Sequence, residues 1–400
     1  MAEMVTLLPD PEPRTRHYTI ISVDDHLIEP ADLFEGRLPK ALAQRAPRIV
    51  VDDGSELWEY EGKRYPQVGL NAVAGRAKED WSMEPTRFDE MRPGCFDIDA
   101  RVRDMDLDGI YASLCFPSLI AGFAGTVFSQ SADQELGLAC LRAWNDWHRE
   151  VWAGSHPDRI IPLQLAWLGD PEIAARDVRE NAARGVKALS FPENPVDLGL
   201  PSMHTDHWDP LLRACEETLT VVCLHNASSS WTAARSPGAP LELFTTLFPV
   251  NAMVAAADWL WAGIPTRFPE LQIAFSEGGV GWVPMLIDRI AYVLDHSAAG
   301  LVAWRDPSLS PIDALRRNFW FCTIDLPSTM ALRDHIGVDH IMMESDYPHA
   351  DSTWPDTQAR AHEGLAGYTG EEIRKLTWET ASRLFRHPVP PELQIPAADR

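Results

Sequence analysis

The chain has 400 residues, of which 45% are hydrophobic and 24% charged, so it is long enough to bury a large core in one domain or two. Its 35 basic and 59 acidic side chains give a net charge of −24, which repels nucleic-acid phosphates and anionic lipid. We therefore exclude nucleic acid and membrane surfaces as partners and expect a small-molecule substrate.

The compartment follows from targeting signals and cysteine usage. No apolar run approaches the roughly 20 residues of a membrane-spanning helix, and the start MAEMVTLLPDPEPRTRH lacks the basic end and apolar stretch of a signal peptide. A cytoplasmic location is the resulting expectation. The cysteines form no C-x-x-C pair and are predicted to be reduced core residues: Cys95, Cys115, Cys140, Cys215, Cys223 and Cys322.

Short apolar runs typical of buried strands recur along the chain. In order they are TIISVDDH (19–26), GIYASLCFPS (109–118), RIIPLQLAWL (159–168), VKALSF (186–191), TVVCLH (220–225), LQIAFSE (271–277), FWFCTID (319–325) and HIMMESD (340–346). Eight runs that alternate with helical patterns predict a single (β/α)8 barrel domain over residues 1–400. An open doubly wound sheet is the alternative, but no glycine-rich nucleotide-binding loop follows any run.

Two of the connecting segments carry a helix-start signal. Asp170 precedes Pro171 at the start of PEIAARDVRENAAR, and Asp209 precedes Pro210 at the start of DPLLRACEE. Aspartate as N-cap followed by proline at the first helical position is a common way to begin a helix. Both segments are predicted to be helical crossovers between strands.

Residues 27 to about 104 interrupt the alternation and are interpreted as an insertion after the first strand. Because loops at the carboxyl ends of barrel strands surround the active site, we expect this insertion to cap it. Trp58, Trp81 and Trp231 are then candidates for the wall of an apolar or aromatic substrate pocket. A surface excursion or a dimer contact is the alternative interpretation of the insertion.

Metal-competent side chains stand at the ends of several predicted strands. Asp24 and His26 end the first run, and strand alternation directs both to the barrel interior. The fifth, sixth and eighth runs end at His225, Glu277 and Asp346. A buried histidine bonded to backbone is the alternative for His225 alone, but convergence of all five at one rim favours a divalent metal site.

Several motifs along the chain, taken together, resemble those of a known family. The motifs that carry this similarity are VDDHLIEP, VVCLHNASSS, SEGGVGW, ESDYPHADSTWP and LTWETASRLF. Through them the chain is similar to the amidohydrolase-related family that includes aminocarboxymuconate semialdehyde decarboxylase. The resemblance implies a (β/α)8 fold and a divalent cation held by the four side chains Asp24, His26, His225 and Asp346. The histidines and carboxylates of the rim suit Zn, Fe or Mn equally well, and either one ion or two could bind. It also implies that a homodimer is common. Reactions in the family include decarboxylation, hydration and the hydrolysis of esters, lactones and thioesters.

One departure from the family pattern bears on the reaction. Decarboxylases of the family typically carry a proton-transferring histidine after the sixth strand, where this chain has Ser276-Glu277-Gly278-Gly279. We therefore expect a hydrolase first, in which a metal-activated water cleaves an ester, thioester, lactone or amide of an apolar carboxylic acid. Glu277 or Asp346 would take the proton from water, or Glu277 would ligate a second cation.

Two other functions remain as alternatives. One is a metal-dependent, non-oxidative decarboxylase of an aromatic or dienoic acid, and the other is a non-catalytic metal-binding barrel. His349 follows Asp346 by three residues, and is expected either to donate to substrate, to orient Asp346 or to cap a helix. Glu193, just beyond the fourth run, is a possible further ligand, although a solvated loop carboxylate is the favoured interpretation.

Overall fold

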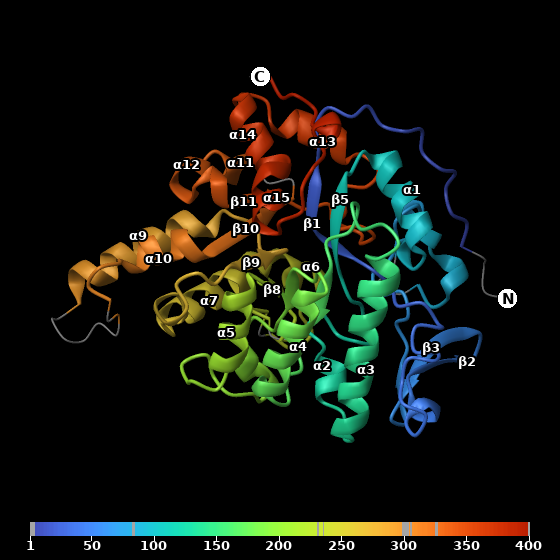
Figure 1. Ribbon diagram of the computed structural model, residues 1–400. Coiled ribbons are helices and arrows are strands. Elements are labelled where there is room, and N and C mark those ends of the chain that lie inside the picture. The colour runs from blue at the N-terminus through green and yellow to red at the C-terminus, as the bar shows by residue number, and fades with distance from the viewer. Residues whose placement is uncertain are drawn as a thin grey trace.

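Eight parallel strands form the centre of the protein (Figure 1). The computed structural model describes residues 5–81, 85–229, 232–234, 236–297, 304, 306–324 and 327–398. Each strand lies inside one of the eight predicted runs, which confirms them. The strands are β1 (Ile21–His26), β5 (Ala112–Phe116), β6 (Leu163–Leu165), β7 (Ala188–Ser190), β8 (Val221–His225), β9 (Ile273–Ser276), β10 (Phe319–Thr323) and β11 (Ile341–Met343).

The order of the strands shows how the sheet closes. Hydrogen-bonded neighbours run β5-β1-β11-β10-β9-β8-β7-β6, so β5 and β6 are the two ends of this series. A parallel bridge joins Ser113 to Ile160, and the Ser113 N–H donates to Arg159 O at 2.9 Å. Ser113 O in turn accepts from the Ile161 N–H at 2.9 Å. The predicted (β/α)8 barrel is therefore confirmed, since only a closed parallel sheet brings its first and last strands together.

Helices connect the strands and surround the sheet (Figure 1). They are α1 (Ile98–Asp108), α2 (Thr126–Ser129), α3 (Gln134–Trp147), α4 (Pro171–Ala183), α5 (Asp209–Thr218), α6 (Leu241–Thr246), α7 (Phe248–Trp261), α8 (Ile264–Arg267), α9 (Trp282–His296), α10 (Pro311–Asn318), α11 (Pro327–Met330), α12 (Arg333–Ile336), α13 (Thr357–Gly364), α14 (Gly370–Arg374) and α15 (Thr380–Leu384). None of the helices in the described residues is both long and apolar enough to cross a membrane.

The two predicted helix starts have different outcomes. Asp170 caps α4 as expected, because its side chain accepts from the Glu172 N–H at 2.8 Å. The prediction for Asp209 is wrong: the N-cap of α5 is Trp208, which makes no side-chain cap bond. The Asp209 carboxylate is instead paired with Arg267, and this contact with a side chain far along the chain replaces the local cap.

Residues 27–104 contain a small antiparallel sheet and the start of a barrel helix. The sheet comprises β2 (Arg48–Asp52), β3 (Ser55–Tyr60) and β4 (Lys63–Tyr65), and Figure 1 shows β2 and β3 on the side of α3. The first barrel helix, α1, already begins at Ile98. Between these elements the backbone N–H groups of Val73 and Ala74 both donate to Pro348 O at 3.0 Å. This contact joins the segment to the loop that follows β11.

All six cysteines are buried and free, as the sequence predicts. A barrel of this size buries a large apolar core, so disulfides are not needed to stabilise it.

Candidate metal centre

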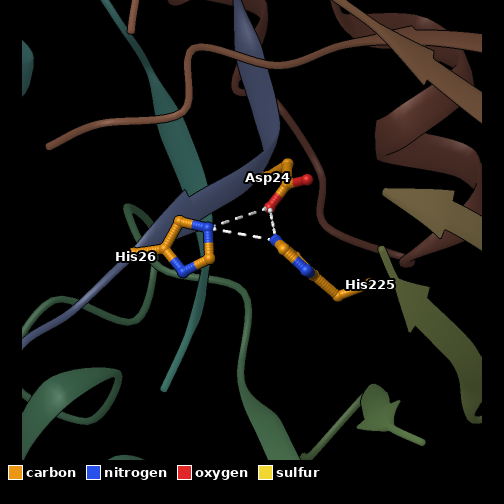
Figure 2. Close-up of side chains that lie close together, drawn as sticks. All are labelled: Asp24, His26 and His225. Atoms are coloured by element: carbon orange, nitrogen blue, oxygen red, sulfur yellow. Dashed lines mark hydrogen bonds and ion pairs between the residues drawn. The ribbon is translucent and has the colours of Figure 1, made fainter. Parts of the chain in front are cut away.

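Three side chains from two strands meet inside the barrel (Figure 2). Asp24, His26 and His225 offer ligand atoms that lie within 4.8 Å of one another. The His225 Nε2 atom is 3.1 Å from His26 Nε2 and 3.6 Å from Asp24 Oδ1. Asp346 completes the group, since its Oδ1 lies 3.3 Å from His26 Nε2. The four side chains expected to hold a metal are therefore adjacent in space.

The backbone at the strand ends explains this convergence. Asp24 and His26 alternate along β1 and so share one face, while His225 is the last residue of β8. Asp346 follows β11 with φ of 56°, and its N–H donates to Asp24 O at 2.9 Å. A non-glycine residue in the left-handed region is unusual and is found most often at functional sites. This turn directs the Asp346 carboxylate towards His26.

Hydrogen bonding and burial fix the histidines in the form that binds metal. His225 Nδ1 lies 2.7 Å from Asn226 O, so Nδ1 carries the proton and the Nε2 lone pair faces the centre. Burial, followed by the proximity of His349, lowers the pKa of His26 to about 4. Burial, followed by His26, also lowers the pKa of His225. Both rings are therefore neutral at physiological pH, as a metal ligand requires.

The carboxylates at the centre fit a cation. Both carboxylate oxygens of Asp24 are buried and accept no hydrogen bond within the described part of the chain. Burial and then the nearby Glu344 and Asp346 carboxylates raise the pKa of Asp24 well above its usual value. Buried oxygens without donors are costly, and a divalent cation would satisfy them while offsetting the repulsion between the acids. The residues present therefore fit the metal that the sequence implies.

A hydrogen-bonded layer holds the ligand-bearing strand ends together. Asp25 accepts from Ser22 Oγ at 2.9 Å and from Ser345 Oγ at 2.6 Å, and it also pairs with Ser113 Oγ. The Tyr347 N–H donates to the same carboxylate at 3.1 Å. Because these partners come from β1, β5 and the loop after β11, Asp25 fixes the relative positions of the strands that carry Asp24, His26 and Asp346.

Glu277 stands beside the centre rather than within the tight group. It follows β9 with φ of 57°, and its Oε2 lies 3.7 Å from His225 Nε2. The side chain is 16% exposed, whereas Asp24 and His26 are closed to solvent. Burial and the Asp346 charge raise the pKa of Glu277 well above its usual value. Its position leaves it free to exchange a proton with a bound molecule or to act as a further ligand.

His349 and Asp351 extend the group on the side of the loop after β11. His349 stacks on His26 with 3.9 Å between ring centroids, and its Nδ1 lies 3.0 Å from Asp346 Oδ1. This contact agrees with the expectation that His349 orients Asp346.

Asp351 was not predicted, although its place two residues after His349 in the segment PHAD was a usable signal. Glu344 was not predicted from the sequence either. Its carboxylate is buried, accepts a hydrogen bond from the Cys322 thiol, and accepts another from the Glu277 N–H at 3.2 Å.

A cavity of about 440 Å³ adjoins the centre. Glu277, His349 and Asp351 face it, and most of the remaining wall is apolar. Phe123, from the loop after β5, also packs against both ligand histidines, with centroid distances of 5.0 Å to His26 and 4.5 Å to His225. The other lining residues are Leu70, Asn71, Asn226, Ala227, Leu241, Phe244, Thr245, Phe248 and Ala350.

Several candidates from the sequence lie elsewhere. Trp58 is 1% exposed and packs edge-on against Phe34 in the core, so it does not line this cavity. Trp81 lines a separate cavity of about 160 Å³ that reaches His349, and Trp231 lies outside the described residues. The interpretation of Glu193 as a solvated carboxylate is wrong. Its side chain is buried. The carboxylate accepts a hydrogen bond from the Ser228 hydroxyl and another from the Ser229 N–H at 2.8 Å.

Comparisons with known proteins agree with this fold. A family model described as "Amidohydrolase" matches residues 40–387, a range that begins after Asp24 and His26. An amidohydrolase from Mycobacterium avium subsp. paratuberculosis is similar in structure, with a TM-score of 0.74 and 24% identity over 93% of this chain and 100% of that one.

Two similar structures are decarboxylases. The 5-carboxyvanillate decarboxylase of Novosphingobium aromaticivorans, complexed with manganese and a nitrobenzoic acid, has a TM-score of 0.65 and 15% identity over 95% of this chain and 100% of that one. The 2,6-dihydroxybenzoate decarboxylase of Rhizobium has a TM-score of 0.61 and 18% identity over 92% of this chain and 99% of that one. At these identities the likeness shows the fold alone.

Proposed function

The chain belongs to the amidohydrolase family, and from this premise we propose that it is a metal-dependent, non-oxidative decarboxylase of an aromatic or dienoic carboxylic acid. The observation that carries the proposal is the position of the ligand group Asp24, His26, His225 and Asp346 beside a largely apolar cavity of about 440 Å³. A divalent cation held by these four side chains would supply positive charge that orients a substrate carboxylate.

The cavity wall favours loss of carbon dioxide. Phe123, Phe244 and Phe248 offer apolar surfaces to a flat, conjugated molecule. During decarboxylation the charge of the carboxylate spreads into the conjugated system, so poorly hydrated surroundings disfavour the starting anion more than the transition state. An apolar wall next to a carboxylate-binding centre therefore suits this reaction.

Glu277 is the side chain of the cavity wall that we expect to donate the proton. When the carbon–carbon bond breaks, its electron pair stays on the substrate carbon, which must then take a proton. Glu277 and His349 both face the cavity. Burial and the neighbouring Asp346 raise the pKa of Glu277, which favours the protonated carboxyl that donation requires. We assign proton donation to Glu277 and the orientation of Asp346 to His349.

Support also comes from the similar structures. The names of the two decarboxylases described above give substituted benzoates as their substrates, and one of the two structures holds manganese. On the support of this likeness and of the apolar wall, we propose decarboxylation before hydrolysis, which is the reverse of the order that Glu277 alone suggests in the sequence. For the cation we propose Mn²⁺, because the similar 5-carboxyvanillate decarboxylase holds manganese. Two imidazoles and two carboxylates can bind this ion, as they can bind zinc or iron.

Hydrolysis of an ester, thioester, lactone or amide is the second candidate, and Glu277 is the observation that favours it. Its Oε2 lies 3.7 Å from His225 Nε2 and faces the cavity, where an ionised carboxylate would accept a proton from an attacking water. No lysine or arginine lines the described wall of this cavity, so a neutral substrate would also be accommodated.

The deciding experiment measures two products at once. Protein loaded with Mn²⁺ is incubated with hydroxybenzoates, aryl esters and acyl thioesters, and released carbon dioxide and released acid are both quantified. Carbon dioxide from a hydroxybenzoate, lost after chelation and restored by Mn²⁺, is the expected result. Hydrolysis of an ester or thioester with no carbon dioxide from any acid would replace the first candidate by the second.

A further inference from the structure

Asn226, which directly follows the expected metal ligand His225, carries a buried amide without a partner. The residue is 2% exposed, and within the described part of the chain neither its Oδ1 nor its Nδ2 atom makes a hydrogen bond. Buried amides are almost always hydrogen-bonded in folded proteins, because losing water without gaining a partner is costly. The amide therefore points to a polar group that the described chain does not itself supply.

The backbone of Asn226 is fixed beside the metal centre. Its carbonyl oxygen accepts from His225 Nδ1 at 2.7 Å, and its N–H donates to Ser276 O, at the end of β9, at 3.2 Å. Neither bond involves the side chain, so the amide is not needed to orient His225. Asn226 is also part of the wall of the cavity of about 440 Å³ that adjoins the centre. A molecule that extends from the centre into this cavity would lie next to Asn226.

The rest of the cavity wall limits what the amide can bind. Phe123, Phe244 and Phe248 offer apolar surfaces to an aromatic ring, whereas Glu277 and Asp351 add acidic groups. None of the described lining residues is a lysine or an arginine, so a second carboxylate on the ring would be repelled without finding a cation. A neutral hydroxyl group fits better, because it both donates and accepts, and an amide offers one group of each kind.

We propose that Asn226 determines substrate specificity by binding a phenolic hydroxyl group of an aromatic acid that carries a single carboxylate. The inference rests on the proposed function, which directs the carboxylate to the metal centre, and adds a second point of recognition. A ring held at both points cannot rotate freely in the cavity. When the hydroxyl is missing, the buried amide stays unpaired, so the site discriminates against that analogue.

The test compares probes that differ only in the hydroxyl group. Dissociation constants of benzoate and of the three hydroxybenzoates are measured by isothermal titration calorimetry on protein loaded with Mn²⁺. Acetophenone and the three hydroxyacetophenones form a second series, which has no carboxylate to lose and no ester bond to cleave. We expect one hydroxy isomer in each series to bind about tenfold more tightly than its parent compound. Isophthalate, which has a second carboxylate, should bind more weakly than benzoate.

In N226L, and in the smaller variant N226A, the advantage of the hydroxylated probe should disappear. Both variants keep the backbone carbonyl that accepts from His225, so their metal content should equal that of the wild type. N194A is the matched control, because Asn194 is also buried with an unpartnered amide nitrogen in the described part of the chain but does not line the cavity. N194A should keep the full advantage.

Four results would overturn the proposal. The wild type prefers no hydroxy isomer in either series, or the preference survives in both N226L and N226A. The two variants weaken the parent and the hydroxylated probes equally, which would mean that Asn226 only shapes the cavity. Isophthalate binds more tightly than every hydroxybenzoate. Failure of the proposed function has a different signature, because the hydroxyacetophenones would still be distinguished through Asn226 while the benzoates would release no carbon dioxide.

Discussion

The Nε2 atoms of His26 and His225 lie 3.1 Å apart, although 199 residues separate the two histidines in the chain. Each ring is fixed by its own strand, β1 or β8, and both rings are buried. Two imidazole nitrogens directed to one point suit a cation that accepts both lone pairs. A cation held by these rings would link opposite sides of the barrel mouth without being part of the packed core.

From this relationship we predict that H26A and H225A each lose the bound metal and the activity together while remaining folded. Each variant removes one of four ligands at a rim, where the core packing of the barrel does not depend on it. Metal content is measured by mass spectrometry and folding by circular dichroism. H204A is the matched control, since His204 is 49% exposed and pairs with Asp258 on the surface. Full activity of a metal-free H225A protein would contradict the metalloenzyme proposal.

Glu277 separates the two candidate reactions. If it donates a proton during decarboxylation, E277Q should lower the rate by about two to four orders of magnitude, and E277H should retain or raise the release of carbon dioxide. If it accepts a proton from water during hydrolysis, E277H should not restore the activity that E277Q loses. Both variants are assayed on hydroxybenzoates and on esters. An E277Q variant with unchanged carbon dioxide release would remove Glu277 from the reaction.

The two parts of the segment 27–104 should behave differently on substitution. Leu70 lines the cavity, so L70A is expected to change the relative rates on substrates of different size. Trp58 is fully packed in the core, so W58A should lower the free energy of unfolding by about 3–5 kcal/mol and leave relative rates unchanged. Unfolding in urea and a substrate panel provide the two measurements. A change of substrate preference in W58A with unchanged stability would contradict the assignment.

The strands and the metal ligands could be predicted because their signals are local. Apolar runs such as TVVCLH end in a polar residue at the rim, and alternation alone places Asp24 and His26 on one face. Glu193 and Trp58 were misplaced because their burial depends on distant partners. Ser228 and Ser229 enclose the Glu193 carboxylate, and Phe34 packs on Trp58. A polar loop sequence carries no sign that another loop will cover it.

Glu193 also provides a test based on pH. Burial, only partly offset by the Ser228 hydrogen bond, raises its pKa to about 7 from 4.5. The folded protein therefore binds more protons here than the unfolded chain between these values. The stability that Glu193 contributes is present below pH 4.5 and is lost as pH rises through 7. Ionising this buried group should cost on the order of 3 kcal/mol at pH 8.

We therefore predict that E193Q, which keeps the acceptor for Ser228 and Ser229 but cannot ionise, becomes more stable relative to the wild type as pH rises. The free energy of unfolding is measured in urea at pH 5 and at pH 8 for both proteins. Because other groups titrate equally in the two, the change in their difference isolates Glu193. E392Q, at an exposed position, should show no such change. E193Q should also keep its bound metal, since Glu193 is held by Ser228 and Ser229 and is not among the four expected ligands of the metal centre. Loss of metal in E193Q, or a difference that does not grow with pH, would contradict the role of Glu193 as a buried structural acid.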